Sequence, residues 1–213
     1  MAAGPDPRLA AFDGTLTVDP HPGGVTILAP DALGLLAIEV AALGVHAQDV
    51  RRARTYTVDG VAVGEFEVEP EHDRAPDWDR FATDLRAALV DPTEVREQLV
   101  ARHRRYQSFS RPTAARPAEP RVFVDNDATD VATIVEVRAA DGIGVLARIT
   151  DVFAPHGVRV DQAYVSTLGH EVVDTFYVTR ADGAKLTDRE LIGDLEQELV
   201  HRLRPSASVH GAD

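Results

Sequence analysis

Cysteine is absent from the 213 residues, which excludes disulfides, thiolate zinc sites, iron–sulfur clusters and cysteine nucleophiles. Long apolar runs are missing as well, since no stretch approaches the roughly 18 residues of a membrane span. The first residues show neither the basic nor the apolar region of a secretory signal. We therefore expect a cytoplasmic protein with no membrane partner.

Positive charge is scarce, and lysine occurs once. The 22 Lys and Arg residues face 35 Asp and Glu residues, so the formal net charge is −13. A field of that sign repels the phosphates of nucleic acids, and we expect no nucleic-acid partner. Aromatic residues make up only 6% of the chain, which also disfavours an RNA-binding sheet face.

The sequence contains an internal repeat that covers most of its length. Shifting the sequence by 110 residues aligns Val25–Leu89 with Val135–Leu199 without a gap, and 16 of the 65 aligned positions are identical. Chance would give about five identities for this composition. The identities include Asp31 with Asp141, Gly34 with Gly144, His46 with His156, and Phe66 with Phe176. The chain is thus predicted to hold two copies of one small unit.

The second copy predicts the element order β-α-β-β-α. Thr133–Ala139 alternates as a strand does, and a helical period begins at Val145. Two further alternating runs, Val158–Thr167 and Val172–Thr179, read as a hairpin. Thr187–Glu190 reads as a capping box with the threonine as N-cap of a last helix. This is the order of a ferredoxin-like βαββαβ sandwich of the α+β class, without its final strand.

The first copy repeats the pattern, and an extra helix with a flexible linker follows it. Val122–Val124 could be the fourth strand of the first copy or an extra strand of the second, and Ala207–Val209 is a weak candidate for the fourth strand of the second. The expected organisation is an N-terminal tail (1–21), a first domain (22–90), a linker helix and flexible linker (91–120), a second domain (121–205) and a C-terminal tail (206–213).

The junction between the first strand and first helix of each copy is the one feature with a chemical consequence. It reads Asp-x-x-Gly at Asp31–Gly34 and at Asp141–Gly144. A helix entered through glycine presents unpaired N–H groups and the positive end of its dipole, which suits the carboxylate of a small metabolite. The structural alternative is that the aspartates cap the helices and the glycines serve the turn. The junction alone favours that alternative.

The junction and its surrounding frame resemble the ACT domain family, small regulatory modules that bind amino acids and pair side by side. The resemblance rests on VEVRAADGIGVLARI from Val135, VDQAYVSTLGHEVVDTFYVT from Val160 and VTILAPDALGLL from Val25. Within that family the chain is similar to the tandem ACT region at the C-terminal end of bifunctional uridylyltransferase/uridylyl-removing enzymes, which modify PII nitrogen-signalling proteins.

The resemblance implies a sensor of nitrogen status with glutamine as the favoured ligand, no cofactor and no catalysis of its own. It implies pairing of ACT units within or between chains, and a nucleotidyltransferase or a PII-type protein as the macromolecular partner. The ligand-binding residues it implies are Asp141, Gly142, Ile143, Gly144, Val145 and Leu146 in the second copy, and Asp31, Gly34, Leu35 and Leu36 in the first.

The second copy is expected to dominate binding. Its loop holds two glycines, Gly142 and Gly144, which leave the first amides of the helix more open. Its hairpin also carries Asp174, where the first copy has Gly64. Both loops lack the Arg-Pro pair that is usual in the family, so the resemblance fixes the ligand class less firmly than the fold.

Catalytic and metal motifs are not found. The only His-Asp pair is His72-Asp73, which has no second histidine at ligand spacing and reads as a solvated loop. His46 and His156 lie at equivalent helix ends, where we expect them to bond carbonyl groups. A ligand-free protein–protein adaptor that docks through Asp91–Arg111 remains the alternative function.

Overall fold

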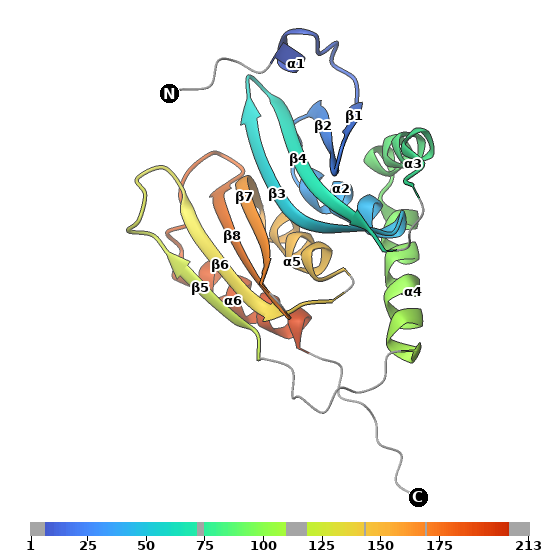
Figure 1. The fold of residues 1–213 in the computed structure, drawn as a ribbon. Helices are drawn as coiled ribbons and strands as arrows, with labels where there is room; N and C mark the ends of the chain where they lie inside the picture. Colours follow the sequence, from blue (N-terminus) through green and yellow to red (C-terminus); the bar gives the residue numbers. More distant parts are fainter. Residues whose placement is uncertain (1–6, 72–74, 110–118, 143, 169, 205–213) are drawn as a thin grey trace, which may run out of the picture.

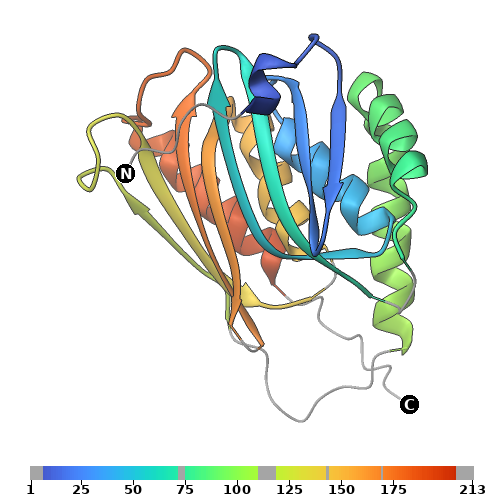
Figure 2. The same ribbon diagram turned by 45° about the horizontal axis from the view of Figure 1, so that its top comes forward.

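Eight strands form one sheet in the part of the chain that the computed structural model describes, residues 7–71, 75–109, 119–142, 144–168 and 170–204. All neighbours are antiparallel, in the order β1-β2-β4-β3-β7-β8-β6-β5. Helices α2, α3, α5 and α6 cover one face, and the short helix α1 lies over the other (Figures 1 and 2). The α+β class predicted from the sequence is confirmed.

The first half supplies four neighbouring strands. Its elements are α1 (Pro7–Ala10), β1 (Thr17–His21), β2 (Gly24–Pro30), α2 (Leu35–Val45), β3 (Gln48–Val58), β4 (Val61–Pro70) and α3 (Trp78–Val90). The order β2-α2-β3-β4-α3 is the predicted one. Strand β1 pairs with β2 at the sheet edge, so residues 17–21, expected in the N-terminal tail, belong to the sheet.

The second half repeats this arrangement. Its elements are β5 (Arg121–Asp125), β6 (Thr133–Ala140), α5 (Val145–Phe153), a 3-10 turn (Ala154–His156), β7 (Val158–Leu168), β8 (Glu171–Arg180) and α6 (Arg189–Leu203). Strand β5 pairs with β6, which assigns Val122–Val124 to the second half. In each half, therefore, the edge strand precedes the βαββα frame. The other candidate, Ala207–Val209, lies outside the described residues.

The two halves meet where β3 pairs with β7. Arg54 stands opposite Tyr164, and these positions are 110 residues apart, like all equivalent positions of the repeat. Ala53 pairs with Val165 and Thr55 with Ala163 around that point. The two halves are thus related by a local two-fold axis between β3 and β7, the self-complementary geometry of a symmetric dimer built within one chain.

The hydrophobic core is continuous under both halves. Phe66 and Phe81 are fully buried in the first half, and Phe153 and Phe176 in the second. Leu195, Leu199 and Leu203 of α6 are buried against this core, and Leu191 on the same side of the helix is partly buried against it. Burial of large aromatic rings from both halves in one cluster makes the halves depend on each other for stability.

The cap of α6 differs from the sequence prediction by one residue. Asp188, and not Thr187, is the N-cap, and its Oδ1 accepts from the amides of Glu190 at 2.9 Å and Leu191 at 3.4 Å. A carboxylate there carries a full negative charge at the positive end of the helix, which a hydroxyl does not.

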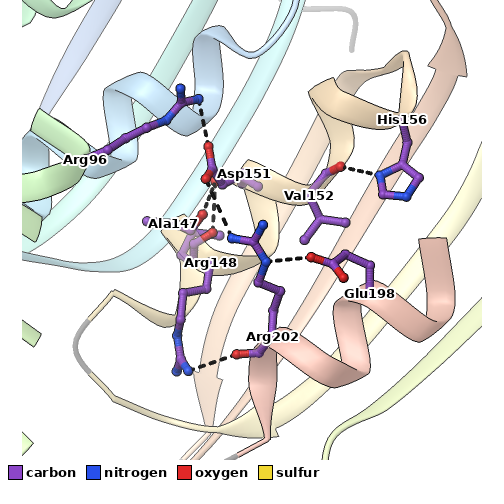
Figure 3. A network of polar contacts seen from close by, with 10 residues as sticks. Arg96, Ala147, Arg148, Asp151, Val152, His156, Glu198 and Arg202 are labelled. Atoms are coloured by element: carbon purple, nitrogen blue, oxygen red, sulfur yellow. Dashed lines mark hydrogen bonds and ion pairs between the residues drawn. The ribbon is translucent and has the colours of Figure 1, made fainter. Parts of the chain in front are cut away.

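Helix α4 (Thr93–Phe109) follows the first half and lies outside α2. It is tied to the second half by an ion pair between Arg96 and Asp151 of α5, at 2.7 Å. Figure 3 shows Arg202 of α6 turned toward the same aspartate, 4.0 Å away, while it donates to Glu198 at 2.7 Å. The connecting helix is therefore part of the folded body and does not simply span a gap.

Close approach of β2 and β4 gives the first testable prediction. A β-carbon at Gly24 would lie 2.1 Å from the backbone oxygen of Phe66, which the sheet ladder holds in place. Gly24→Ala should therefore lower the free energy of unfolding in urea by about 2–3 kcal/mol. Gly193→Ala in α6, where nothing lies within 4 Å, is the control. It should raise stability by about 0.5–1 kcal/mol, and equal effects of the two changes would contradict the packing described.

Candidate functional site

Each predicted loop lies against the central strand of the other half. Both loops start in the same way, because the amide of Asp31 donates to Gly60 O and that of Asp141 to His170 O, each at 2.9 Å. The residues that follow turn inward beside β3 and β7. The sequence placed the loops in their own copies, but only the structure shows which strand each one faces.

The second loop lines a cavity of about 40 Å³. Strand β3 of the first half contributes Asp49 and Val50, and strand β8 contributes Asp174. The predicted residues that line it are Asp141, Gly142, Gly144, Val145 and Leu146; Ile143 lies outside the described residues. The structure therefore brings all the described members of this predicted set together.

The first loop lines an equivalent cavity of about 30 Å³. Strand β7 of the second half contributes Val160 and Asp161 there. The predicted residues that line it are Asp31, Leu35 and Leu36. Gly34 instead borders a separate cavity of about 20 Å³ beside Ala154. The first predicted set is therefore divided, while the second is not.

Both helices begin at a glycine in the left-handed region, with φ of 83° at Gly34 and 72° at Gly144. Neither N-cap has a side-chain hydrogen bond, so the alternative in which the aspartates cap these helices is wrong. Asp141 instead accepts from the amide of Gly142 at 2.8 Å. The amide of Leu35 donates to Ala32 O at 3.2 Å and that of Val145 to Gly142 O at 3.1 Å. The amides that follow in the first turns of α2 and α5 have no side-chain acceptor among the described residues, as an anion site requires.

Arginines from the opposite half hold the loop aspartates. Arg159 of β7 pairs with Asp31 at 2.8 Å, and Arg51 of β3 approaches Asp141 at 3.9 Å. Arg51 also donates to Glu69 at 2.8 Å, which explains its longer contact with the loop. These pairs are partly exposed, so each contributes little to stability. Their effect is to fix where each loop sits relative to the other half.

Asp174 is the buried acid of the second cavity, with no exposed surface. Its Oδ1 accepts from the amide of Ser166 at 3.3 Å, and its Oδ2 has no partner among the described residues. Burial raises the pKa of this carboxyl to about 7, the Ser166 amide opposes the rise, and the charge of Asp141 adds to it. A carboxyl in this state exchanges its proton near neutral pH.

Glu39 of α2 is the buried acid of the first cavity, and the sequence analysis missed it. Its side chain is 2% exposed, and Oε1 has no partner among the described residues. Burial raises the pKa of the Glu39 carboxyl to about 8. The signal was present in the sequence, because Glu39 is the only charged residue in the apolar run from Leu35 to Val45.

Helix α4 touches the second loop and breaks the symmetry of the two sites. A β-carbon at Gly144 would lie 3.7 Å from Leu99 Cδ1, so the helix packs directly on the turn. Arg102 of α4 pairs with Glu71, which lines the second cavity. No residue of α4 lines the first cavity within the described part of the chain.

The histidines have ordinary roles where they are described. His156 Nδ1 lies 2.9 Å from the carbonyl oxygen of Val152, as predicted (Figure 3). His46 is the C-cap of α2 as predicted, with its backbone N–H on the carbonyl oxygen of Ala42 at 3.0 Å, while its side-chain Nε2 contacts the Asp84 carboxylate at 3.0 Å. His72 and Asp73 lie outside the described residues. Among the residues described, no group of three or more acids and histidines is placed to hold a metal ion.

A cavity of about 460 Å³, larger than either loop cavity, lies elsewhere, between α2, α3 and α4. Helix α4, which forms one wall, has no counterpart among the described elements of the second half, and the rim includes Ala75, directly after residues 72–74, which are not described. The two small loop cavities recur at equivalent positions of the repeat. Recurrence and buried acids, rather than size, make them the candidate sites.

No helix in the described ranges is long and apolar enough to cross a membrane.

The buried acids predict how stability depends on pH. Folding raises the pKa of Glu39 from 4.5 to about 8, so between these values the folded chain holds a proton that the unfolded chain has lost. Stability from this group is complete below pH 4.5 and is lost as the pH rises to about 8, with a slope of about 1.4 kcal/mol per pH unit. Glu39→Gln should flatten that fall in urea titrations between pH 5 and pH 9.

Glu97→Gln, on the exposed side of α4, is the matched control and should leave the pH profile unchanged. A wild-type profile that rises with pH over this interval would contradict the burial of an unpaired acid.

Comparison with known proteins identifies the family relationship. Residues 128–204 match the family model of the ACR family N-terminal ACT domain. A bifunctional uridylyltransferase/uridylyl-removing enzyme of Streptomyces coelicolor is 36% identical over 180 residues, which are 80% of this chain and 21% of that enzyme. The enzyme of the same name from Ectopseudomonas mendocina is 31% identical over 193 residues, 86% of this chain and 20% of that enzyme.

The chain spans about a fifth of the length of these curated relatives. The crystal structure of aspartate kinase from Synechocystis aligns with 83% of this chain and 26% of that one at 15% identity, with a TM-score of 0.38 that is too low to compare the folds. The chain therefore contains a domain of the ACT type in residues 128–204, and over most of its length it is similar to about a fifth of the length of bifunctional uridylyltransferase/uridylyl-removing enzymes.

Proposed function

We propose that this chain is an amino-acid-sensing regulatory module of nitrogen signalling, with glutamine as its ligand. It consists, in this proposal, of two ACT units of the ferredoxin-like type. The first is residues 22–90 together with the preceding strand β1 (Thr17–His21), and the second is residues 121–205, which contain β5; β1 and β5 are the fourth strands. The observation that carries the proposal is the pair of equivalent loop cavities, each closed by a strand of the other half. The similarity to the uridylyltransferases supports it.

The ligand's carboxylate would bind at the start of α5 or α2. Glycine N-caps leave amides of the first turn without side-chain acceptors, and the helix dipole adds positive potential. The arginines from the opposite strand are already paired with the loop aspartates, so the helix amides are the better anion site. A ligand held there would touch both halves at once.

Regulation follows from the size of the cavities. Volumes of about 40 and 30 Å³ have room for water but not for an amino acid. Ligand binding therefore requires a packing of the two halves in which these cavities are wider. Glutamine would shift the population toward that packing, and its affinity would be lowered by the fraction of molecules in the closed one.

The protein that reads this change is, in our proposal, a nucleotidyltransferase or a PII-type protein, and this chain does not itself transfer or remove nucleotides. The basis is that the relatives are enzymes of which this chain matches about a fifth. Helix α4 is suited to carry the signal, since it packs on the second loop through Leu99 and on α5 through Arg96.

Glutamine should raise the melting temperature of the purified chain, because it binds the folded state only. At a concentration of 100 times Kd, one site contributes about 2.7 kcal/mol to the free energy of unfolding. Thermal unfolding is to be followed with each of the twenty amino acids, and glutamate is the closest control for the amide. A flat series would reject amino-acid sensing and favour the adaptor that docks through residues 91–111.

A further inference from the structure

Two buried acids stand in equivalent cavities although they come from different elements. Asp174 belongs to strand β8 of the second half, and Glu39 belongs to helix α2 of the first half. Each lines its loop cavity, each is at most 2% exposed, and each has one oxygen without a partner among the described residues.

The two carboxyls occupy the same place in the repeat. Gly64 aligns with Asp174, and a β-carbon at Gly64 would lie 3.2 Å from Glu39 Oε2. The Glu39 carboxyl therefore fills the space that the Asp174 side chain occupies in the second half. Ile149 stands at the position equivalent to Glu39, so at this point of each cavity there is one fully buried acid and not two.

Within the described part of the chain, no group forms a hydrogen bond with Glu39 Oε1 or Asp174 Oδ2. Burying an acid with an unpaired oxygen destabilises a protein, so replacement by an apolar side chain would be favourable for folding alone. Each cavity nevertheless keeps one such acid at the same point. An unpaired acceptor that is retained in both halves indicates a donor that arrives with the ligand.

The charges around each cavity favour a cationic donor. The second cavity has the carboxylates of Asp49, Glu71 and Asp141 on its wall, and the first has those of Asp31 and Asp161. The nearby arginines are already engaged: Arg51 with Asp49 and Glu69, Arg102 with Glu71, and Arg159 with Asp31 and Asp161. Each cavity thus has an excess of negative charge that a protonated amine would neutralise.

We propose that Asp174 and Glu39 each receive the protonated amino group of one ligand molecule, so that the chain binds two molecules of an α-amino acid in equivalent sites. This inference rests on the proposed function and specifies its ligand chemistry and stoichiometry. It replaces the expectation that the second copy dominates, because that expectation rested partly on the missing acid at Gly64.

Calorimetry with glutamine and with glutaramic acid, which is glutamine without its α-amino group, tests the proposal on the wild-type chain. Wild type should bind two glutamines and prefer glutamine to glutaramic acid by about 10- to 100-fold, the range of a charged hydrogen bond. Asp174→Asn should remove that preference at one site, and Glu39→Gln at the other. Glu97→Gln should change neither the stoichiometry nor the preference.

Proton release on glutamine binding is a second measurement, and it would not change in the variants if Asp174 and Glu39 had a purely structural role. Burial raises the pKa of both acids, so an ammonium group that binds beside them will ionise them and release protons. Titrations at pH 6.5 in buffers of different ionisation enthalpy should show release by wild type and less release by each variant.

The possible failures are distinguishable. If wild type binds no amino acid, the proposed function fails and this inference fails with it. If glutamine binds but glutaramic acid binds equally well, or the two variants keep two sites and the full preference, the proposed function stands and the role of the acids is overturned.

Discussion

The pairing of β3 with β7 is the contact on which the candidate sites depend. Because Arg54 lies opposite its own repeat equivalent, Tyr164, the residues of the aligned frames, Val25–Leu89 and Val135–Leu199, have counterparts across the same axis. This places Val50 at the second loop and Val160 at the first. Each cavity is built from both halves, so neither half alone contains a complete site, and any change in the pairing alters both cavities together.

The same pairing accounts for the crossed ion pairs. Positions 49 and 51 carry Asp and Arg, whereas the equivalent positions 159 and 161 carry Arg and Asp. The sequence order of charge is reversed, yet in both halves an arginine of the central strand reaches the loop aspartate of the opposite half. The contacts differ in length because Arg51 also donates to Glu69. The two central strands therefore carry Asp and Arg in opposite sequence order, and both still form an arginine–aspartate contact with the loop of the other half.

Symmetry ends at helix α4, which the first half supplies and the second half lacks among its described elements. Leu99 packs on the turn at Gly144, and Arg96 pairs with Asp151 of α5. The second loop is therefore coupled to a helix as well as to a strand, whereas the first loop meets the sheet and the turn after α5. Two equivalent cavities, each with one fully buried acid, are in this way connected to different surroundings.

The sequence by itself determined the repeat, the βαββα order of each half and the position of the two glycine turns. These follow from alternation, helical periodicity and turn residues, which are local properties of the chain. It placed the cap of α6 one residue early, because Thr187 and Asp188 are both good caps and only the backbone path selects one. It left the fourth strands open, because edge pairing joins segments that no local pattern connects.

Only the tertiary structure decided which residues share a cavity. Glu39 lies in a helix and aligns with Ile149, so no comparison of equivalent positions pairs it with Asp174. The packing of α2 on the sheet brings its carboxyl to the space above Gly64. Side chains of different length on different elements can bring their carboxyl groups to the same place in the fold. A sequence alignment compares backbone positions only and does not show where a side chain ends.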